Sequence, residues 1–229
     1  MRKALMTTTA VALVTGAAMW LVATAGAQGG GTIEVDVKYG GAPQIEKIKV
    51  NKDTEKCGTE TTIEKVVVGG NKGLANAVVS VPGAKGATAA KAVLDQHGCK
   101  FVPHVLVMAP GELEVKNSDD ILHNLHTYST ANPSINKAQP KFKKTMTEKL
   151  EKPEMVKVTC DVHSWMLGWV AVVPGPAGVT DKDGVAKIDN VPAGKQKVEV
   201  WHETLGKMEK EVDVKAGAVT KVSFEMKGK

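Results

Sequence analysis

Aromatic residues are scarce in this chain. Phe, Trp and Tyr make up 4% of its 229 residues, whereas glycine, at 23 residues, is abundant. Many valines lie in short runs that alternate apolar and polar residues and end at Gly or Pro. Alternation with a period of two is typical of half-buried strands. These features predict an all-β protein.

A concentrated basic stripe with interleaved aromatic residues is also missing. The formal net charge is +5, and acidic residues are interspersed among the basic ones. Since nucleic-acid-binding proteins gather their positive charge on one face, we expect no nucleic acid partner. Residues 137–152 contain six lysines and two glutamates. We interpret this stretch as solvated surface, with a docking patch for an acidic partner as the alternative.

Residues 1–27 have the features of a secretory signal peptide. Arg2 and Lys3 precede an apolar run, and Ala25-Gly26-Ala27 offers a cleavage site of small residues. No cysteine follows the run directly, so a lipoprotein anchor is not indicated. We expect a periplasmic or otherwise secreted protein, with no membrane contact after cleavage. The alternative is an uncleaved anchor, because the run approaches the about 20 residues that span a bilayer.

A thiol, an imidazole and a thioether lie close together in the sequence. Cys160, His163 and Met166 follow the spacing C-x2-H-x2-M. Sulfur ligands together with imidazole suit copper. The preceding residues alternate like a strand, and Val156 and Val158 share the parity of Cys160, so we expect the thiol to point into the core. The alternative is a buried cysteine beside a surface histidine and a core methionine.

A second segment supports a metal site. Residues 112–116 alternate as a strand and lead into a loop that ends at His123-Asn124. Gly111 to Asn124 resembles the strand and loop that deliver the first histidine of plastocyanin, azurin and amicyanin, and the Cys-to-Met spacing resembles that of amicyanin. The resemblance to these blue-copper proteins, the cupredoxins, covers about Val93 to Val173.

The resemblance implies a copper site and a set of residues around it. The implied copper ligands are His123, Cys160 and His163, with Met166 as a weak axial ligand. Asn124 would join the two ligand loops by hydrogen bonding. An exposed edge of His163, rimmed by Trp165 and Met166, would be the electron port, the place where electrons enter and leave. Trp165 could equally pack against the loop.

His126 offers a different metal site. Together with His123, Cys160 and His163 it could form a four-coordinate zinc site. Residues three apart on a regular strand face opposite sides, however, so His123 and His126 would not both point inward. Zinc would also leave Met166 without a role. We therefore expect His126 to lie beside the metal ligands or at the rim of the site.

Only three cysteines are present. If Cys160 holds the metal, Cys57 and Cys99 remain as a pair, and an oxidising compartment would allow them to form a disulfide. The alternative is two buried thiols.

Changes in the sequence pattern divide the chain into four segments. We expect a signal peptide at 1–27, N-terminal strands at 28–92 that pack on or extend the next unit, a cupredoxin core at 93–173 and a small module at 174–229. The stretch from Thr180 to Trp201 resembles the carboxypeptidase regulatory-like, or transthyretin-like, β module. About 55 residues is little chain for an independent core, so the module should pack against the copper domain or borrow N-terminal strands. The predicted fold is all-β, a Greek-key cupredoxin sandwich with a small C-terminal β-sandwich.

These features favour a periplasmic blue-copper electron carrier that exchanges electrons with redox protein partners and is not an enzyme. The first alternative is a non-catalytic structural or partner-binding β protein of an envelope assembly. The second is a copper or zinc enzyme, which would need an open coordination position that Met166 would occupy.

Overall fold

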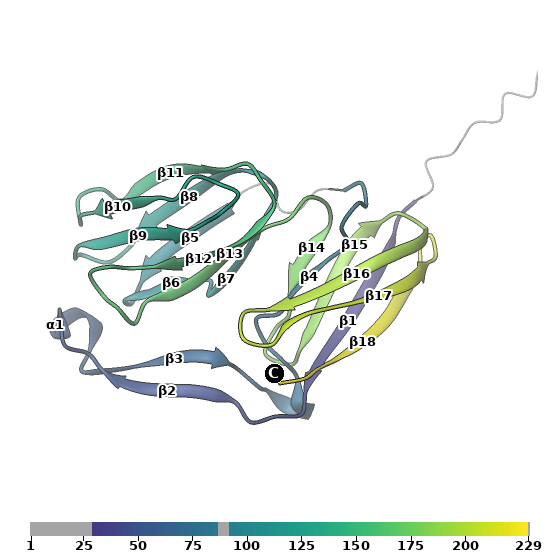
Figure 1. Cartoon of the computed structure of the whole chain (residues 1–229), viewed down its shortest axis with the longest axis horizontal. Helices are drawn as coiled ribbons and strands as arrows, with labels where there is room; N and C mark the ends of the chain where they lie inside the picture. Colours follow the sequence, from purple (N-terminus) through teal and green to yellow (C-terminus); the bar gives the residue numbers. More distant parts are fainter. Residues whose placement is uncertain (1–28, 87–91, 229) are drawn as a thin grey trace, which may run out of the picture.

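The structure is a computed structural model that describes residues 29–86 and 92–228; the expected signal peptide lies outside these residues. The chain is all-β, as predicted. It forms two β-sandwiches side by side, and a long hairpin extends from one of them across the end of the other (Figure 1). Within the described residues, no helix is long and apolar enough to span a membrane.

The first sandwich spans residues 92–173 and has two sheets. Their strand orders are β10-β9-β12-β13-β7 and β11-β8-β5-β6. β13 with β7 and β5 with β8 are parallel pairs, and the other pairs are antiparallel. The strands are β5 (Ala92–His97), β6 (Lys100–Val102), β7 (Val105–Met108), β8 (Gly111–Asn117), β9 (His123–Tyr128), β10 (Asn136–Gln139), β11 (Thr145–Leu150), β12 (Glu154–Thr159) and β13 (Leu167–Val172). This all-β arrangement is consistent with the predicted cupredoxin-like sandwich.

The core of the first sandwich lies between these sheets. Alternation places Leu113 and Val115 of β8 opposite Val156 and Val158 of β12, and all four side chains have no exposed surface. The predicted strands at 112–116 and 154–159 are therefore confirmed. Removing these apolar side chains from water stabilises the sandwich by roughly 1.5–3 kcal/mol for each fully buried residue.

The second sandwich combines both ends of the described chain. Its sheets have the orders β15-β1-β18 and β14-β4-β16-β17. The strands are β1 (Gly31–Tyr39), β4 (Val78–Ser80), β14 (Ala177–Val179), β15 (Val185–Val191), β16 (Gly194–His202), β17 (Gly206–Val214) and β18 (Val219–Met226). A short 3-10 turn, η1 (Gly70–Lys72), precedes β4. A turn at Asp183-Gly184 leads into β15, with Gly184 in the left-handed region at φ 81°.

We expected the strands of residues 28–92 to pack on or extend the first sandwich, or else to be borrowed by the C-terminal module, and β1 and β4 follow the second alternative. β1 pairs with β15 and, in parallel, with β18, and β4 pairs with β14 and β16. Ile33, Val35 and Val37 of β1 are fully buried between the sheets of the second sandwich. The physical reason is that the C-terminal strands alone would leave these sheets incomplete.

The hairpin formed by β2 (Gln44–Lys49) and β3 (Glu60–Val66) packs against the core of the first sandwich. The two strands pair with each other and with no third strand. The helical turn α1 (Thr54–Cys57) forms the tip of the hairpin, beside the first sandwich in Figure 1.

Residues 137–152, which we expected to be solvated surface, contain most of β10 and all of β11. On β11, Met146, Glu148 and Leu150 are buried and the residues between them are exposed. Because Glu148 is a charged residue at a buried position, the sequence of β11 does not show the usual alternation of apolar and polar residues. The carboxylate of Glu148 accepts a hydrogen bond of 2.7 Å from Lys137 Nζ.

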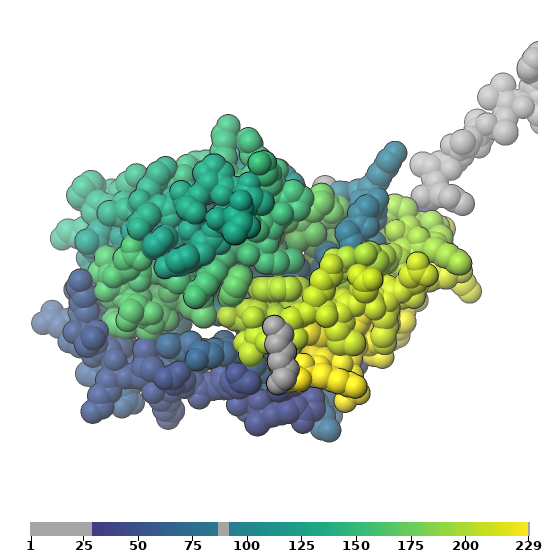
Figure 2. All heavy atoms as spheres, in the orientation of Figure 1, coloured from purple at the N-terminus to yellow at the C-terminus, as the bar shows by residue number. Residues whose placement is uncertain are grey.

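A small apolar cluster joins the two sandwiches. It contains Val105 and Ala171 from the first sandwich and Val78 from the second. Trp169 of the first and Trp201 of the second pack edge to face, with ring centroids 5.0 Å apart. The two bodies are in close contact in the space-filling view (Figure 2).

Candidate metal centre

Cys160 directly follows β12 and shares the parity of the strand's buried valines. Its side chain is buried, as are Val156 and Val158, so the predicted inward direction is confirmed. Cys160 is the free cysteine of the described chain. Burial raises the pKa of its thiol, and hydrogen bonds from the backbone of His163 and Asn124 partly oppose this. A metal that binds the sulfur would displace the proton.

The loop after Cys160 turns back sharply. The amide of Met166 donates a hydrogen bond of 2.9 Å to the carbonyl of His163, and β13 begins one residue later. This turn directs the imidazole of His163 back toward Cys160. His123, the first residue of β9, approaches the same point from the neighbouring strand. The structure therefore brings together two histidines and one cysteine that the sequence placed in separate loops.

The three donor atoms form a triangle. The Nδ1 atoms of His123 and His163 lie 3.0 Å apart, and Cys160 Sγ lies 4.0 Å from the first and 3.8 Å from the second. A metal at the centre of a trigonal plane, with bonds as long as those of zinc, about 2.0 Å to nitrogen and about 2.3 Å to sulfur, would put the nitrogens about 3.5 Å apart and each nitrogen about 3.7 Å from sulfur. The measured distances agree within about 0.5 Å. The donor set fits one metal ion.

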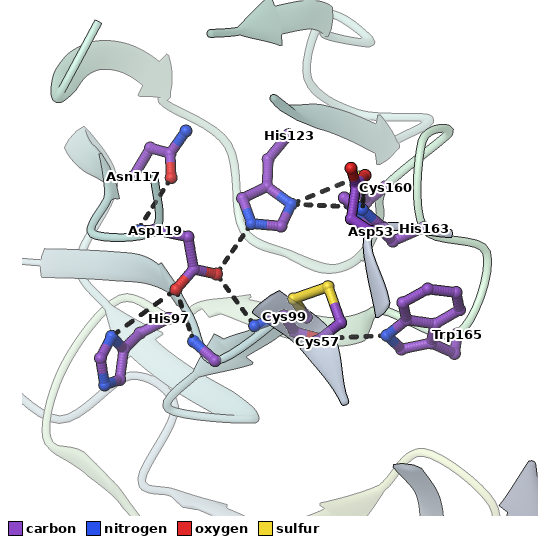
Figure 3. The surroundings of a disulfide bond; sticks show 11 residues. Asp53, Cys57, His97, Cys99, Asn117, Asp119, His123, Cys160, His163 and Trp165 are labelled. Carbon is purple, nitrogen blue, oxygen red and sulfur yellow. Dashed lines mark hydrogen bonds and ion pairs between the residues drawn. A yellow bond between two sulfur atoms is a disulfide. The ribbon is translucent and has the colours of Figure 1, made fainter. Parts of the chain in front are cut away.

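Each imidazole is held from its outer side by a carboxylate. Asp119 Oδ2 lies 2.9 Å from His123 Nε2 (Figure 3), and Asp53 Oδ2 lies 2.9 Å from His163 Nε2. A carboxylate accepts, so each Nε2 carries the proton and each Nδ1 presents a lone pair toward Cys160. Such outer partners fix the ring orientation and raise the basicity of a metal-binding histidine.

Asp119 is itself fixed by the backbone. Its carboxylate accepts hydrogen bonds from the amides of Gly98, at 2.8 Å, and Cys99, at 2.9 Å. Burial alone would raise the pKa of Asp119, but these hydrogen bonds and the one from His123 outweigh it and lower the pKa. For His123, burial is the larger influence and lowers the pKa, although Asp119 acts in the opposite direction. Without metal, both groups therefore favour a neutral imidazole beside an ionised carboxylate.

Cys57 and Cys99 form the predicted disulfide, 42 residues apart in sequence. Cys99, Asp119 and His123 also bring possible ligand atoms within 4.8 Å of one another. The sulfur of Cys99 forms the disulfide with Cys57. The outer nitrogen of His123, Nε2, donates its hydrogen bond to Asp119. This group therefore belongs to the surroundings of the metal centre and is not a separate site.

Met166 and Trp165 lie in the core beside the donors. Met166 is 1% exposed and Trp165 is 6% exposed, and both belong to the core cluster that contains Cys160. The indole nitrogen of Trp165 donates a hydrogen bond of 3.2 Å to the carbonyl of Cys99. Met166 is thus placed in the ligand loop, and its role as axial ligand stays a prediction.

The edge of His163 that we expected to be exposed is buried. His163 has no exposed surface, and Trp165 is only 6% exposed. The reason is the β2–β3 hairpin, whose Asp53 covers the outer nitrogen of His163. This arrangement corrects our expectation of an electron port at the edge of His163.

Asn124 and His126 surround the donors. Asn124 Oδ1 accepts a hydrogen bond of 3.2 Å from the amide of Asp161, and its amide nitrogen donates one of 2.7 Å to Asn136 Oδ1. Asn124 therefore links the two ligand loops in the way the resemblance implied. The ring of His126 stacks on Tyr128, and its Nδ1 lies 2.8 Å from Asp161 Oδ1. His126 is not among the clustered donors of the described residues.

Sequence reasoning missed Asp53 and Asp119. Asp119 had a usable signal, because it stands four residues before His123 in the loop that carries this ligand. Asp53 had none, since it lies 110 residues from His163 in an ordinary polar turn.

No protein family model and no curated protein matches the chain. Among solved structures, the chain is similar to a purple cupredoxin from Nitrosopumilus maritimus, at 19% identity and a TM-score of 0.31, over 36% of this chain and 99% of that one. It is similar to amicyanin from Paracoccus versutus, at 14% identity and a TM-score of 0.33, over 41% of this chain and 96% of that one.

The chain is also similar to a copper-containing nitrite reductase from Thermus scotoductus, at 20% identity and a TM-score of 0.33. The match covers 39% of this chain and only 24% of the reductase. At such TM-scores these similarities do not decide the chemistry of the site, and the function proposed below rests on the site's own residues.

Proposed function

We propose that the protein is a periplasmic type 1 copper protein that transfers electrons. His123, Cys160 and His163 would be the equatorial ligands and Met166 the weak axial ligand. The single observation that carries the proposal is the buried triangle of two Nδ1 atoms and one Sγ atom. A trigonal His2Cys set with a distant methionine is the blue-copper arrangement.

The protein's own part in this function is to keep the donors fixed. When bound, copper would supply a one-electron couple between Cu(I) and Cu(II). Cys160 is set by β12, and the two imidazoles are held by Asp119 and Asp53. Since the side chains are close-packed in the core, the donor positions change little when the charge at the centre changes.

Burial of the donors supports a carrier over an enzyme. His123 and His163 have no exposed surface, and Cys160 is 2% exposed. A small substrate would need an open coordination position that solvent can reach. Electrons can cross a layer of protein, whereas a substrate cannot. A redox protein that docks on the surface is therefore the partner we propose.

The other candidates have less support. The zinc site would need His126 beside Cys160, but the ring of His126 is bonded to Asp161 and stacked on Tyr128. A purely structural protein would not need two carboxylates oriented on the outer nitrogens of two buried histidines. The periplasmic location is supported by the Cys57–Cys99 disulfide, because such bonds persist in oxidising compartments.

Anaerobic redox titration of the copper-loaded protein tests electron transfer. We expect one electron per chain to bleach the colour and one electron to restore it, over repeated cycles without loss of metal. A copper-loaded protein whose absorption does not change on reduction and reoxidation would contradict the proposal.

A further inference from the structure

The β2–β3 hairpin is fastened to the end of the first sandwich that holds the donors. Val50, just after β2, is buried in the core cluster of the first sandwich, and Ile48 and Ile63 pack against the same cluster. The disulfide between Cys57 of α1 and Cys99 fixes the tip covalently. In Figure 3 the disulfide lies in the same group of residues as Asp53, His123 and His163. The hairpin is therefore part of the wall around the metal centre.

Asp53 is placed precisely by this attachment. Its backbone is in the left-handed region, at φ 50° and ψ 38°, which is uncommon for residues other than glycine, asparagine and aspartate. Its carbonyl accepts hydrogen bonds of 2.9 Å from the amides of Lys56 and Cys57. Cys57 thus both donates a backbone hydrogen bond to Asp53 and forms the disulfide with Cys99. The carboxylate projects from this turn to His163.

The contact between Asp53 and His163 acts on one atom of a proposed ligand. Asp53 Oδ2 lies 2.9 Å from Nε2, on the side of the ring opposite the donor Nδ1. A carboxylate there holds the ring in one orientation and increases the electron density at the donor nitrogen. A more basic donor stabilises Cu(II) more than Cu(I). The side chain of Asp53 is 36% exposed, whereas His163 has no exposed surface, so Asp53 also separates the ring from solvent.

Resting on the function proposed above, we propose that Asp53, held in place by the Cys57–Cys99 disulfide, is a positioning residue for His163 that lowers the reduction potential of the centre. The second sandwich thereby contributes to the redox site through the hairpin that it supports. The edge of His163 is closed by this hairpin and does not serve as the contact point for a redox partner.

Asp53→Asn tests the carboxylate, because asparagine has the same shape and tolerates the left-handed backbone. Glu55→Gln is the matched control, since it removes the same charge from the same helical turn, where Glu55 is exposed. The blue absorption should remain in both variants. In Asp53→Asn the preference for Cu(II) over Cu(I) should fall about tenfold, which raises the potential by about 59 mV for one electron. Glu55→Gln should shift it by less than a third of this.

The disulfide is tested by repeating the Asp53→Asn measurement in a Cys57→Ser/Cys99→Ser background. If the disulfide holds Asp53 on His163, the shift caused by Asp53→Asn should shrink to less than half. An undiminished shift would show that the disulfide does not position Asp53.

The outcomes separate this inference from the proposed function. A wild-type protein that takes up no copper would overturn the proposed function and, with it, this inference. A wild-type protein with the blue absorption and with the same potential as Asp53→Asn would overturn this inference alone.

Discussion

The indole nitrogen of Trp169 in the first sandwich donates a hydrogen bond of 2.7 Å to Glu203 Oε2 in the second. The other carboxylate oxygen of Glu203 is bonded to the ring of His104, also from the first sandwich. The side chain of Glu203 is only 7% exposed. Hydrogen bonds from Trp169 and His104 therefore take the place of hydrogen bonds from water to its carboxylate. This buried carboxylate connects the body that holds the metal centre to the body that supports the hairpin.

Glu203→Ala should weaken the contact between the sandwiches. The change leaves two donors without their partner, and an unsatisfied buried group costs about 1–3 kcal/mol. We expect the free energy of unfolding, measured in urea, to fall by about 2–4 kcal/mol. Glu209→Ala is the control, because Glu209 is exposed and pairs with Lys197 on the surface; it should cost less than about 1 kcal/mol. Equal losses in the two variants would contradict the role of Glu203.

His202, the neighbour of Glu203, should make stability depend on pH. Burial lowers the pKa of His202 to about 4, and it has almost no exposed surface. Between the unfolded pKa of about 6.5 and the folded value, the unfolded chain binds a proton that the folded chain does not. Stability should therefore be full above about pH 6.5 and fall by up to about 3 kcal/mol as the pH drops to about 4.

The variant His202→Gln isolates this contribution. Urea denaturation at several pH values should show a smaller loss of stability in His202→Gln than in the wild type across the same window. Parallel pH profiles for the two proteins would show that His202 is not buried in the neutral form.

The disulfide should contribute strongly to stability. Closing a loop between residues 42 positions apart corresponds to about 4 kcal/mol on the chain-entropy model. We expect Cys57→Ser/Cys99→Ser to lower the free energy of unfolding by about 3–4 kcal/mol. Mass spectrometry of the unreduced, metal-free protein after alkylation should show one modified cysteine, Cys160. Three modified cysteines would contradict the bridge.

As the proposed axial ligand, Met166 should influence the reduction potential of the copper centre. A thioether favours Cu(I), and the identity of the axial ligand tunes the potential of such sites. Met166→Gln offers a harder oxygen and should lower the potential, while Met166→Leu removes the ligand and should raise it. Met146→Leu, a change at another methionine of the same core, is the control and should leave the potential unchanged. If voltammetry gives the same potential for all four proteins, Met166 is not an axial ligand.

The candidate ligands could be predicted because each is encoded locally. Cys160 takes its inward direction from the alternation of β12, and His123 is the first residue of β9, the strand that pairs with β12. Alternation also predicted the strands at 112–116 and 154–159. It did not reveal the pairing of β1 with β15 and β18, because a strand's local pattern says which face is buried but not which strand lies beside it.

The cover over His163 was not predictable for a related reason. Lys52, Asp53 and Thr54 read as a polar turn, which any surface hairpin would carry. Only the tertiary contact, fixed by a disulfide whose partner lies 42 residues away, makes the carboxylate of Asp53 part of the metal centre. The expectation of an exposed His163 edge came from the resemblance to cupredoxins, and the hairpin lies outside the segment that the resemblance covers.

The central claim is that Cys160 binds copper together with His123 and His163. Titration of the metal-free protein with Cu(II), followed by visible absorption, tests it most directly. We predict an intense band at about 600 nm from the copper–thiolate bond, saturating at one copper per chain, and its complete absence in Cys160→Ser with an unchanged far-ultraviolet circular dichroism spectrum. A wild-type protein that stays colourless with one equivalent of Cu(II), or a band that persists in Cys160→Ser, would contradict the account.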